Sequence, residues 1–182
     1  GKDSAKYNSQ ADAESMIEQL RNLTFWQVED HKEVKKKNSP PLFHLTSLQQ
    51  EANRKFSYSA AKTLSITQAL YEKHKAVTYP RTDANVLPSD YVQTAEQVLD
   101  ALATSYPASS TVIDNNWVQL QSANKRIFND ALISDHFAIV PTDKVPSGLS
   151  SDEKNIYELI VKRFIAVFYP AAEYNYTKRI TC

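Results

Sequence analysis

The chain has 182 residues, of which 42% are hydrophobic and 23% charged, a balance typical of a globular protein with one domain or one domain and part of another. Basic and acidic residues both number 21, so the net charge is zero and does not by itself attract nucleic acid, although a local basic surface stays open. One cysteine excludes an internal disulfide, two glycines exclude a glycine-rich phosphate loop, and the apolar runs are too short to cross a membrane.

The first part of the chain is predicted to form one helix and one strand. Apolar spacing favours a short helix over residues 11–22. A strand is expected over residues 23–37, beginning near Phe25 and Trp26 and ending in a charged edge. Residues 38–41 are expected to form a linker, because two adjacent prolines cannot donate to a sheet ladder.

Two helices are predicted next. A capping-box pattern places the first over residues 48–56, and Ser59 is expected to cap a second that reaches about His74. A strand-like stretch follows at residues 75–82. This order is typical of a helix-turn-helix or winged-helix unit, although many helical pairs share it.

The second half is predicted to be helical between loops, with a strand at its end. The predicted elements are a helix from Ser89, a loop at 103–116, a short helix at 124–133, a compact loop at 134–142, a helix capped by Ser151 that ends before Pro170, and a strand from Glu173 onward. We expect this last strand to pair with the strand at 23–37. Both ends look cut, which suggests a piece of a longer protein.

Three side chains are candidates for chemistry. On an extended chain, residues two apart project to the same side, so Tyr79 and Arg81 could meet one phosphate. A guanidinium binds phosphate through two hydrogen bonds and keeps its charge. His136, in a polar loop before an apolar run, could bind a phosphate or move a proton. Pattern alone favours structural roles for Tyr79 and His136, since the chain has 10 tyrosines and most tyrosines pack in cores or interfaces.

Four sequence blocks resemble type IA DNA topoisomerases. They are Phe43–Phe56, Ser59–Glu72, Thr78–Asp83 (Thr-Tyr-Pro-Arg-Thr-Asp) and His136–Thr142 (His-Phe-Ala-Ile-Val-Pro-Thr), in the family's order and at compatible separations. The Tyr-Pro-Arg form is most similar to the topoisomerase III branch. The resemblance runs from about residue 23 to the end of the chain.

The resemblance implies roles for the three candidate residues. Tyr79 would be the nucleophile that cleaves one strand of DNA through a 5′-phosphotyrosine link, followed by strand passage and religation without ATP. Arg81 would hold and neutralise the scissile phosphate. His136 would lie near the DNA backbone. Many family members have serine where this chain has Ala84, so that hydroxyl is absent or is supplied by another residue.

The resemblance also implies a fold class and partners. We expect an α+β, mainly α fold, with a winged-helix-like catalytic tyrosine domain over residues 41–170 and parts of an arch domain at 1–40 and 171–182. Mg²⁺ is implied for the full-length enzyme, with no ligands in this chain. The implied partners are single-stranded DNA, the metal-binding domain of the same protein and a helicase, in the cytoplasm. The isolated fragment is predicted to be inactive.

Three other interpretations remain open at this stage. The main alternative is a non-catalytic winged-helix DNA-binding module, which would need a basic recognition helix; the second predicted helix has only a modest basic excess. A tyrosine recombinase would place several Arg and His residues before a tyrosine near the chain end, which does not fit. The third is a purely architectural fragment.

Overall fold

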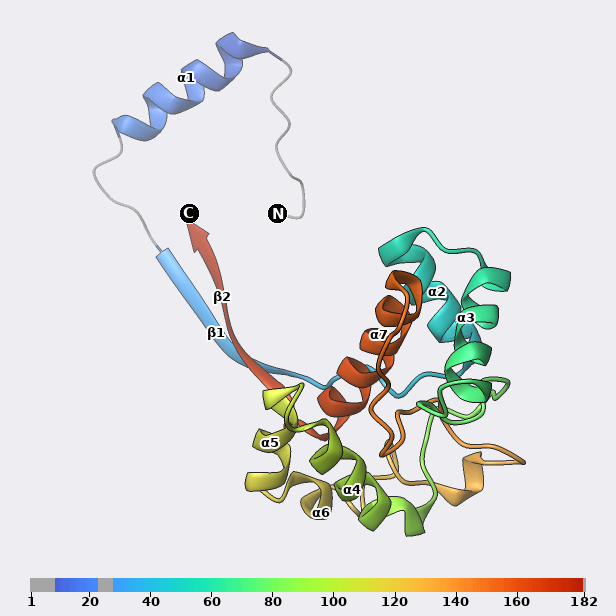
Figure 1. The fold of residues 1–182 in the computed structure, drawn as a ribbon. Helices are drawn as coiled ribbons and strands as arrows, with labels where there is room; N and C mark the ends of the chain where they lie inside the picture. Colours follow the sequence, from blue (N-terminus) through green and yellow to red (C-terminus); the bar gives the residue numbers. More distant parts are fainter. Residues whose placement is uncertain (1–8, 23–27, 182) are drawn as a thin grey trace. The chain divides into compact units, whose positions relative to one another are not determined.

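The chain divides into two compact units. The computed structural model describes residues 9–22 and 28–181. One unit consists of Gly1–Lys36 together with Glu173–Cys182, and the other of Lys37–Ala172. The chain therefore leaves the first unit, forms the second, and returns (Figure 1). Within the described ranges, no helix is both long and apolar enough to cross a membrane.

The first unit contains helix α1 (Gln10–Arg21) and two strands. The Ser9 hydroxyl accepts a hydrogen bond from the Asp12 amide at 3.2 Å and so caps α1. This helix lies within one residue of its predicted ends. Strand β1 (Val28–Lys37) pairs with strand β2 (Ala172–Thr181), as predicted for the described part of the strand at 23–37. Residues 23–27, with Phe25 and Trp26, lie outside the described residues.

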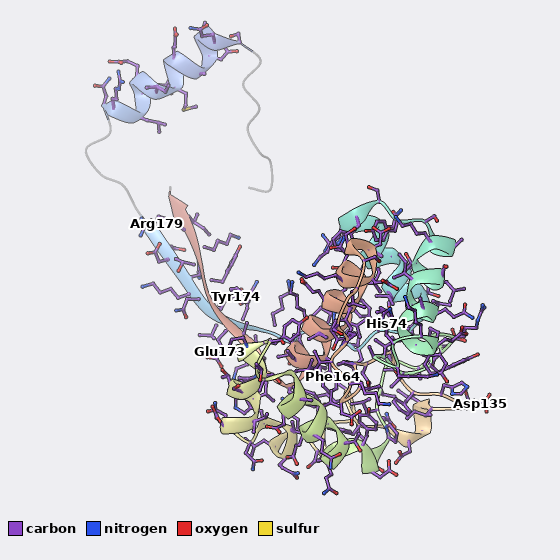
Figure 2. All side chains as sticks on the ribbon, viewed as in Figure 1. His74, Asp135, Phe164, Glu173, Tyr174 and Arg179 are labelled. Carbon is purple, nitrogen blue, oxygen red and sulfur yellow. The ribbon has the colours of Figure 1, made fainter. Side chains whose placement is uncertain are left out.

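Charged cross-strand pairs set the register of the β1–β2 ribbon. Arg179 donates two hydrogen bonds to the Asp30 carboxylate, each 2.8 Å long, and the Lys36 ammonium lies 2.7 Å from Glu173. A step of six residues forward along β1 thus matches six residues backward along β2, so the strands are antiparallel. Side chains of the ribbon are exposed to solvent; Tyr174, for example, is 55% exposed (Figure 2). An isolated two-stranded ribbon is marginally stable, so these pairs matter for its alignment.

The second unit is built around helix α7 (Ser151–Phe168). Its cap is Ser150, whose hydroxyl accepts from the Glu153 amide at 3.3 Å, while the Glu153 carboxylate accepts from the Ser150 amide at 2.8 Å. The predicted cap at Ser151 was therefore wrong by one residue, because the glutamate that completes the capping box stands three residues after Ser150. The predicted end before Pro170 is confirmed.

The apolar face of α7 forms the centre of the core. It packs against α2 (Leu45–Phe56), α3 (Ala60–Glu72) and α5 (Pro107–Asp114) (Figure 1). Phe164 and Phe168 are completely buried, with ring centroids 5.3 Å apart in an edge-to-face contact. Figure 2 labels Phe164 on α7. The 3.6-residue period of α7 places this stripe inward on every turn.

Helix α2 begins three residues earlier than predicted. The Leu45 amide donates to the Thr82 carbonyl at 3.0 Å, and the Ser47 hydroxyl accepts from the His44 amide at 3.1 Å. A tertiary hydrogen bond from a distant segment thus satisfies one of the free amides of the first turn, which the local pattern could not indicate. The helix ends before Ser57, which has a left-handed backbone with φ of 58°.

Helix α3 is capped by Ser59, as predicted. The Ser59 hydroxyl accepts from the Lys62 amide at 3.1 Å. The helix ends at Glu72, two residues before the predicted end near His74.

The predicted strand at residues 75–82 is not formed. Within this segment only Val77 makes a β-bridge, to Pro141. Pro80 is buried and has no amide proton, so a continuous ladder cannot extend through it. Among the described residues of this unit, β pairing is limited to three isolated bridges, the others being Phe43 to Ile139 and Leu87 to Phe128. The winged-helix assignment and the domain limits at 41–170 stay predictions.

The middle of the chain differs most from its prediction. Ser89 does not cap a helix; its amide and hydroxyl donate to the Asp130 carboxylate at 2.9 and 2.6 Å. The chain forms a 3₁₀ turn at Ser89–Tyr91 and then helix α4 (Val92–Leu102). Helix α5 lies within the predicted loop at 103–116, and α6 (Trp117–Leu120) follows it. The predicted helix at 124–133 is reduced to a 3₁₀ turn at Asp130–Leu132.

Candidate functional site

A tight turn after α3 directs the chain to Tyr79. Lys75 has a left-handed backbone with φ of 53°, and the Ala76 amide donates to the Leu70 carbonyl at 2.9 Å. A non-glycine residue with positive φ is uncommon and needs support from its surroundings. Here the Lys75 carbonyl accepts from the Thr142 hydroxyl at 2.7 Å. These hydrogen bonds fix the turn after α3, so that the chain runs toward the segment at residues 138–142.

The Thr78 side chain fastens the residue before Tyr79 to this segment. Its hydroxyl donates to the Ala138 carbonyl at 2.8 Å and accepts from the Val140 amide at 2.9 Å. The Thr78 amide also donates to the Val140 carbonyl at 2.9 Å. These three hydrogen bonds hold the backbone beside Tyr79 at a fixed distance from the loop that follows His136.

Thr82 makes the matching connection after Arg81. Its hydroxyl donates to the carbonyl of His136 at 2.9 Å and accepts from the Ala84 amide at 3.1 Å. Thr82 is 6% exposed and Ala84 9% exposed, so both groups are shielded from water. Two threonines, one on each side of Tyr79 and Arg81, thus attach this segment to the segment that carries His136.

Tyr79 and His136 are in direct contact. Their ring centroids are 4.2 Å apart, with the planes inclined by 39°. Tyr71, from the last turn of α3, makes an edge-to-face contact with Tyr79, with ring centroids 5.5 Å apart. Tyr79 is partly exposed and His136 is exposed. Within residues 9–22 and 28–181 no group makes a hydrogen bond with the Tyr79 hydroxyl. The prediction that Tyr79, Arg81 and His136 converge on one phosphate stays a prediction.

Arg81 lies on the exposed surface and is held by α3. Its guanidinium donates to the Gln68 side-chain oxygen at 3.3 Å, and the Gln68 amide group donates to Glu72 at 3.1 Å. Across the described ranges, no carboxylate forms an ion pair with Arg81, so its charge stays open to an anionic ligand. Gln68 and Tyr71 stand three residues apart, on one face of α3.

The sequence pattern did not identify the four residues that position this site. They are Gln68, Tyr71, Thr78 and Thr82. The spacing of the first two on one helix face was a readable signal. The threonine hydrogen bonds cross more than 50 residues of sequence and left no local signal. Asp135, beside His136, lies on an exposed loop and takes no part in these contacts (Figure 2).

A metal site is not formed by the side chains that the structure describes. No group of three or more His, Cys, Asp or Glu residues in those ranges is placed to hold an ion. The phenol of Tyr79 and the imidazole of His136 are in contact, and the Arg81 guanidinium follows two residues after Tyr79; their action on a phosphate stays a prediction.

Comparison with known proteins decides the family. The family model described as DNA topoisomerase matches residues 1–181. The chain belongs to the DNA topoisomerase family. It is 45% identical over 152 residues to DNA topoisomerase 3 of Bacillus subtilis (strain 168), a match that covers 82% of this chain and 20% of that protein. It is 44% identical over 146 residues to DNA topoisomerase 3 of Shouchella clausii (strain KSM-K16), covering 79% and 20%.

A solved topoisomerase has the same fold over the whole chain. The structure of full-length topoisomerase I from Thermotoga maritima matches with a TM-score of 0.60 and 22% identity, covering 100% of this chain and 31% of that one. The mostly helical topoisomerase fold with a small sheet is thus confirmed. The chain spans about a fifth of the length of the curated topoisomerases 3 that it matches.

Proposed function

We propose that this chain supplies the nucleophile of a type IA DNA topoisomerase that cleaves and rejoins one DNA strand. The observation that carries the proposal is the contact between Tyr79 and His136 on an exposed surface, within the sequence blocks of a DNA topoisomerase. Arg81, two residues from Tyr79 and without an ion-pair partner in the described ranges, supplies the charge for a phosphate.

The chemical step is a transesterification. The Tyr79 oxygen forms a bond to phosphorus, and the bond from phosphorus to the 3′ oxygen breaks. The phenol proton is transferred, in the net reaction, to the departing 3′ oxygen, which leaves a 3′ hydroxyl and a 5′-phosphotyrosine. Because the phosphodiester energy is kept in the tyrosyl ester, the 3′ hydroxyl can reverse the reaction without ATP.

Each neighbour of Tyr79 has a distinct role in this scheme. Arg81 neutralises the charge on the phosphoryl oxygens as it develops. His136 packs on the phenol ring and orients it. Gln68 limits the positions that the Arg81 guanidinium can take. Mg²⁺ would be held in the full-length enzyme by its metal-binding domain; the residues that the structure describes form no cluster of His, Cys, Asp or Glu that could hold an ion.

A chimeric enzyme tests the proposal. The matching segment of Bacillus subtilis DNA topoisomerase 3 is replaced by this chain, and covalent adducts with a radiolabelled single-stranded oligonucleotide are measured. Tyr79→Phe should abolish the adduct and retain oligonucleotide binding. Tyr174→Phe, an exposed tyrosine of the ribbon, is the matched control and should form adduct normally. Adduct formation by Tyr79→Phe would show that another residue is the nucleophile, whereas oligonucleotide binding without adduct by the unsubstituted chimera would favour the non-catalytic DNA-binding module.

Two further variants rank the neighbours. Arg81→Gln should slow adduct formation more than His136→Gln, because a guanidinium contacts phosphate directly and stays charged at every working pH. Equal effects of the two substitutions on the rate of adduct formation would argue against these roles.

The 182-residue chain alone is expected not to relax supercoiled DNA. The described residues provide the nucleophile but no metal cluster. A plasmid relaxation assay with Mg²⁺ checks this, and relaxation by the purified chain would contradict the proposed division of the active site.

A further inference from the structure

His74 joins the end of α3 to the first turn of α7. It lies two residues after the last residue of α3, and its Nε2 atom is 3.1 Å from a carboxylate oxygen of Glu153 (Figure 2). The two side chains are only 11% and 14% exposed. The other Glu153 oxygen accepts from the amide and the hydroxyl of Ser150, each at 2.8 Å. The helix cap therefore holds the carboxylate in place and gives His74 a fixed partner.

The direction of this hydrogen bond follows from the charge of Glu153. The amide and then the hydroxyl of Ser150 lower the pKa of Glu153 from 4.5 to about 2. Near neutral pH the carboxylate is ionised and can only accept, so Nε2 of His74 carries the hydrogen and donates it. Hydrogen bonds to an ionised group are among the stronger ones in proteins. The contact thus fixes the imidazole of His74 and the backbone at the end of α3.

Two features that shape the surroundings of Tyr79 adjoin His74. Tyr71, on the last turn of α3 before His74, makes the edge-to-face contact with Tyr79. Lys75, the next residue after His74, has the left-handed backbone that turns the chain toward Tyr79. A non-glycine residue keeps such a backbone only where its neighbours support it. A displacement of His74 would therefore reach Tyr79 both through the ring of Tyr71 and through the chain itself.

We propose that His74 is a positioning residue for the nucleophile. By donating to Glu153 it holds the end of α3 and the turn at Lys75, and so keeps the phenol of Tyr79 against Tyr71. His74 acts through these contacts and not on the phosphate itself. The chemical consequence of this role rests on the proposed function, whereas the structural link from His74 to the contact between Tyr71 and Tyr79 does not.

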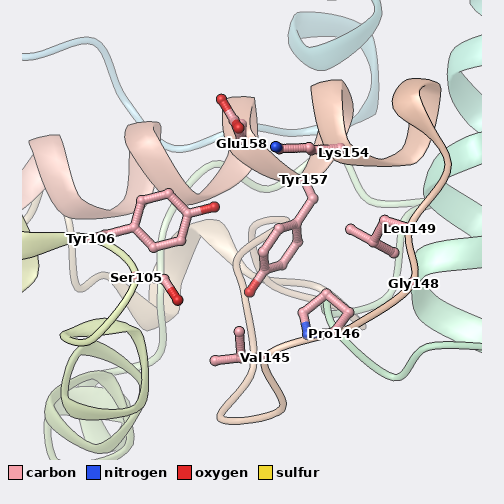
Figure 3. Close-up of a pocket in the computed structure, with 9 residues that line it drawn as sticks. All are labelled: Ser105, Tyr106, Val145, Pro146, Gly148, Leu149, Lys154, Tyr157 and Glu158. Atoms are coloured by element: carbon pink, nitrogen blue, oxygen red, sulfur yellow. The ribbon is translucent and has the colours of Figure 1, made fainter.

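The same two helices offer matched controls. Lys62, near the start of α3, lies 2.7 Å from the Asp152 carboxylate and so also links α3 to the first turn of α7, through an exposed pair. Lys154 follows Glu153 on α7 but lines a cavity of about 480 Å³ (Figure 3). His74 and Glu153 do not line that cavity. Lys62→Gln and Lys154→Gln therefore change α3 and α7 without removing the His74 hydrogen bond.

Two substitutions of His74 differ only in reach. Glutamine places its amide nitrogen the same number of bonds from Cα as Nε2 of histidine, so His74→Gln keeps a donor for Glu153. Asparagine has the same amide group one bond closer to the backbone, so His74→Asn loses the contact. Circular dichroism of the 182-residue chain shows that each variant folds. If the shorter side chain unfolds it, His74→Leu, which fills a similar space without a donor, takes its place.

The first measurement is structural and needs no DNA. Nuclear Overhauser contacts between the rings of Tyr71 and Tyr79 are recorded by NMR in the 182-residue chain. We expect them in wild type, in His74→Gln and in both lysine controls, and we expect His74→Asn to lose them. Unchanged ring contacts in His74→Asn overturn the proposal.

The second measurement is chemical. Adduct formation by the chimeric enzyme is followed at a saturating concentration of single-stranded oligonucleotide, and oligonucleotide binding is measured separately. His74→Asn should slow adduct formation on the order of tenfold and leave the affinity unchanged, because a small displacement of a nucleophile is costly even when substrate is bound. His74→Gln and both lysine controls should react at the wild-type rate.

The outcomes separate this proposal from the proposed function. A slow His74→Asn whose rate is restored in His74→Gln supports the positioning role. A normal rate in His74→Asn, an equally slow rate in His74→Gln, or a loss of affinity in place of a loss of rate overturns it. If the unsubstituted chimera forms no adduct, the proposed function fails, and the ring contacts in the 182-residue chain still decide whether His74 holds Tyr79 in place.

Discussion

The hydrogen bonds of Thr78 offer a direct test of how the site is held together. Replacing Thr78 with valine keeps the shape of the side chain and removes its hydroxyl. The Ala138 carbonyl and the Val140 amide, which now pair with that hydroxyl at 2.8 and 2.9 Å, would both lose this partner. Val140 and Ala138 are completely buried, so water cannot replace it without opening the core.

The expected cost follows from these two groups. A buried polar group left without a partner costs about 1–3 kcal/mol, so we expect Thr78→Val to lower the free energy of unfolding by about 3 kcal/mol. For a unit of this size that corresponds to a fall of roughly 10 °C in melting temperature. Urea unfolding of the 182-residue chain, followed by circular dichroism, measures the loss.

Thr46→Val is the control for this experiment. Thr46 is exposed in the first turn of α2, and across the described ranges its side chain makes no hydrogen bond. Its substitution should change stability by less than about 0.5 kcal/mol. If Thr78→Val loses no more than Thr46→Val, the Thr78 hydrogen bonds do not hold the Tyr79 and His136 segments together, and our account of the site is wrong.

Two further predictions concern α7. Phe164→Ala should lower the free energy of unfolding by about 3–5 kcal/mol, because it opens a cavity in a completely buried cluster; a loss below about 1 kcal/mol in urea unfolding would contradict that packing. The Ser150 amide and hydroxyl, with His74, lower the pKa of Glu153 from 4.5 to about 2. The ionised group thus stabilises the fold above pH 4.5 and this contribution is lost as the pH falls toward 2. The stability difference between wild type and Glu153→Gln should therefore shrink over that interval, and a constant difference would refute the assignment.

The sequence predicted those elements that are determined by local signals. Helix α3 begins after its predicted cap, Ser59, and helix α7 has the predicted 3.6-residue apolar stripe that ends at Phe168. Both helices formed within two residues of their predicted bounds. Helix α5 was missed because its eight residues carry little apolar periodicity, although Pro107 at its first turn was a start signal. The start of α2 depends on the Thr82 carbonyl, which is distant in sequence.

In the site, too, local signals could be predicted from the sequence and tertiary contacts could not. The Tyr79 and Arg81 spacing was readable, whereas their neighbours on α3 were recognised only in the structure. The contact of Tyr79 with His136 spans 57 residues and was expected from the family resemblance, not from any local pattern. Tertiary hydrogen bonds from Thr78 and Thr82 create it, and a single sequence does not show which distant carbonyl a threonine will meet.

The central claim is that Tyr79 becomes linked to DNA. The most direct measurement is to trap the covalent complex of the chimeric enzyme with a single-stranded oligonucleotide, digest protein and DNA, and locate the modified residue by mass spectrometry. We predict a nucleotide attached through its 5′ phosphate to Tyr79, in the peptide that contains Thr78 and Arg81. A nucleotide on Tyr71 or any other tyrosine, or attachment through a 3′ phosphate, would contradict the account.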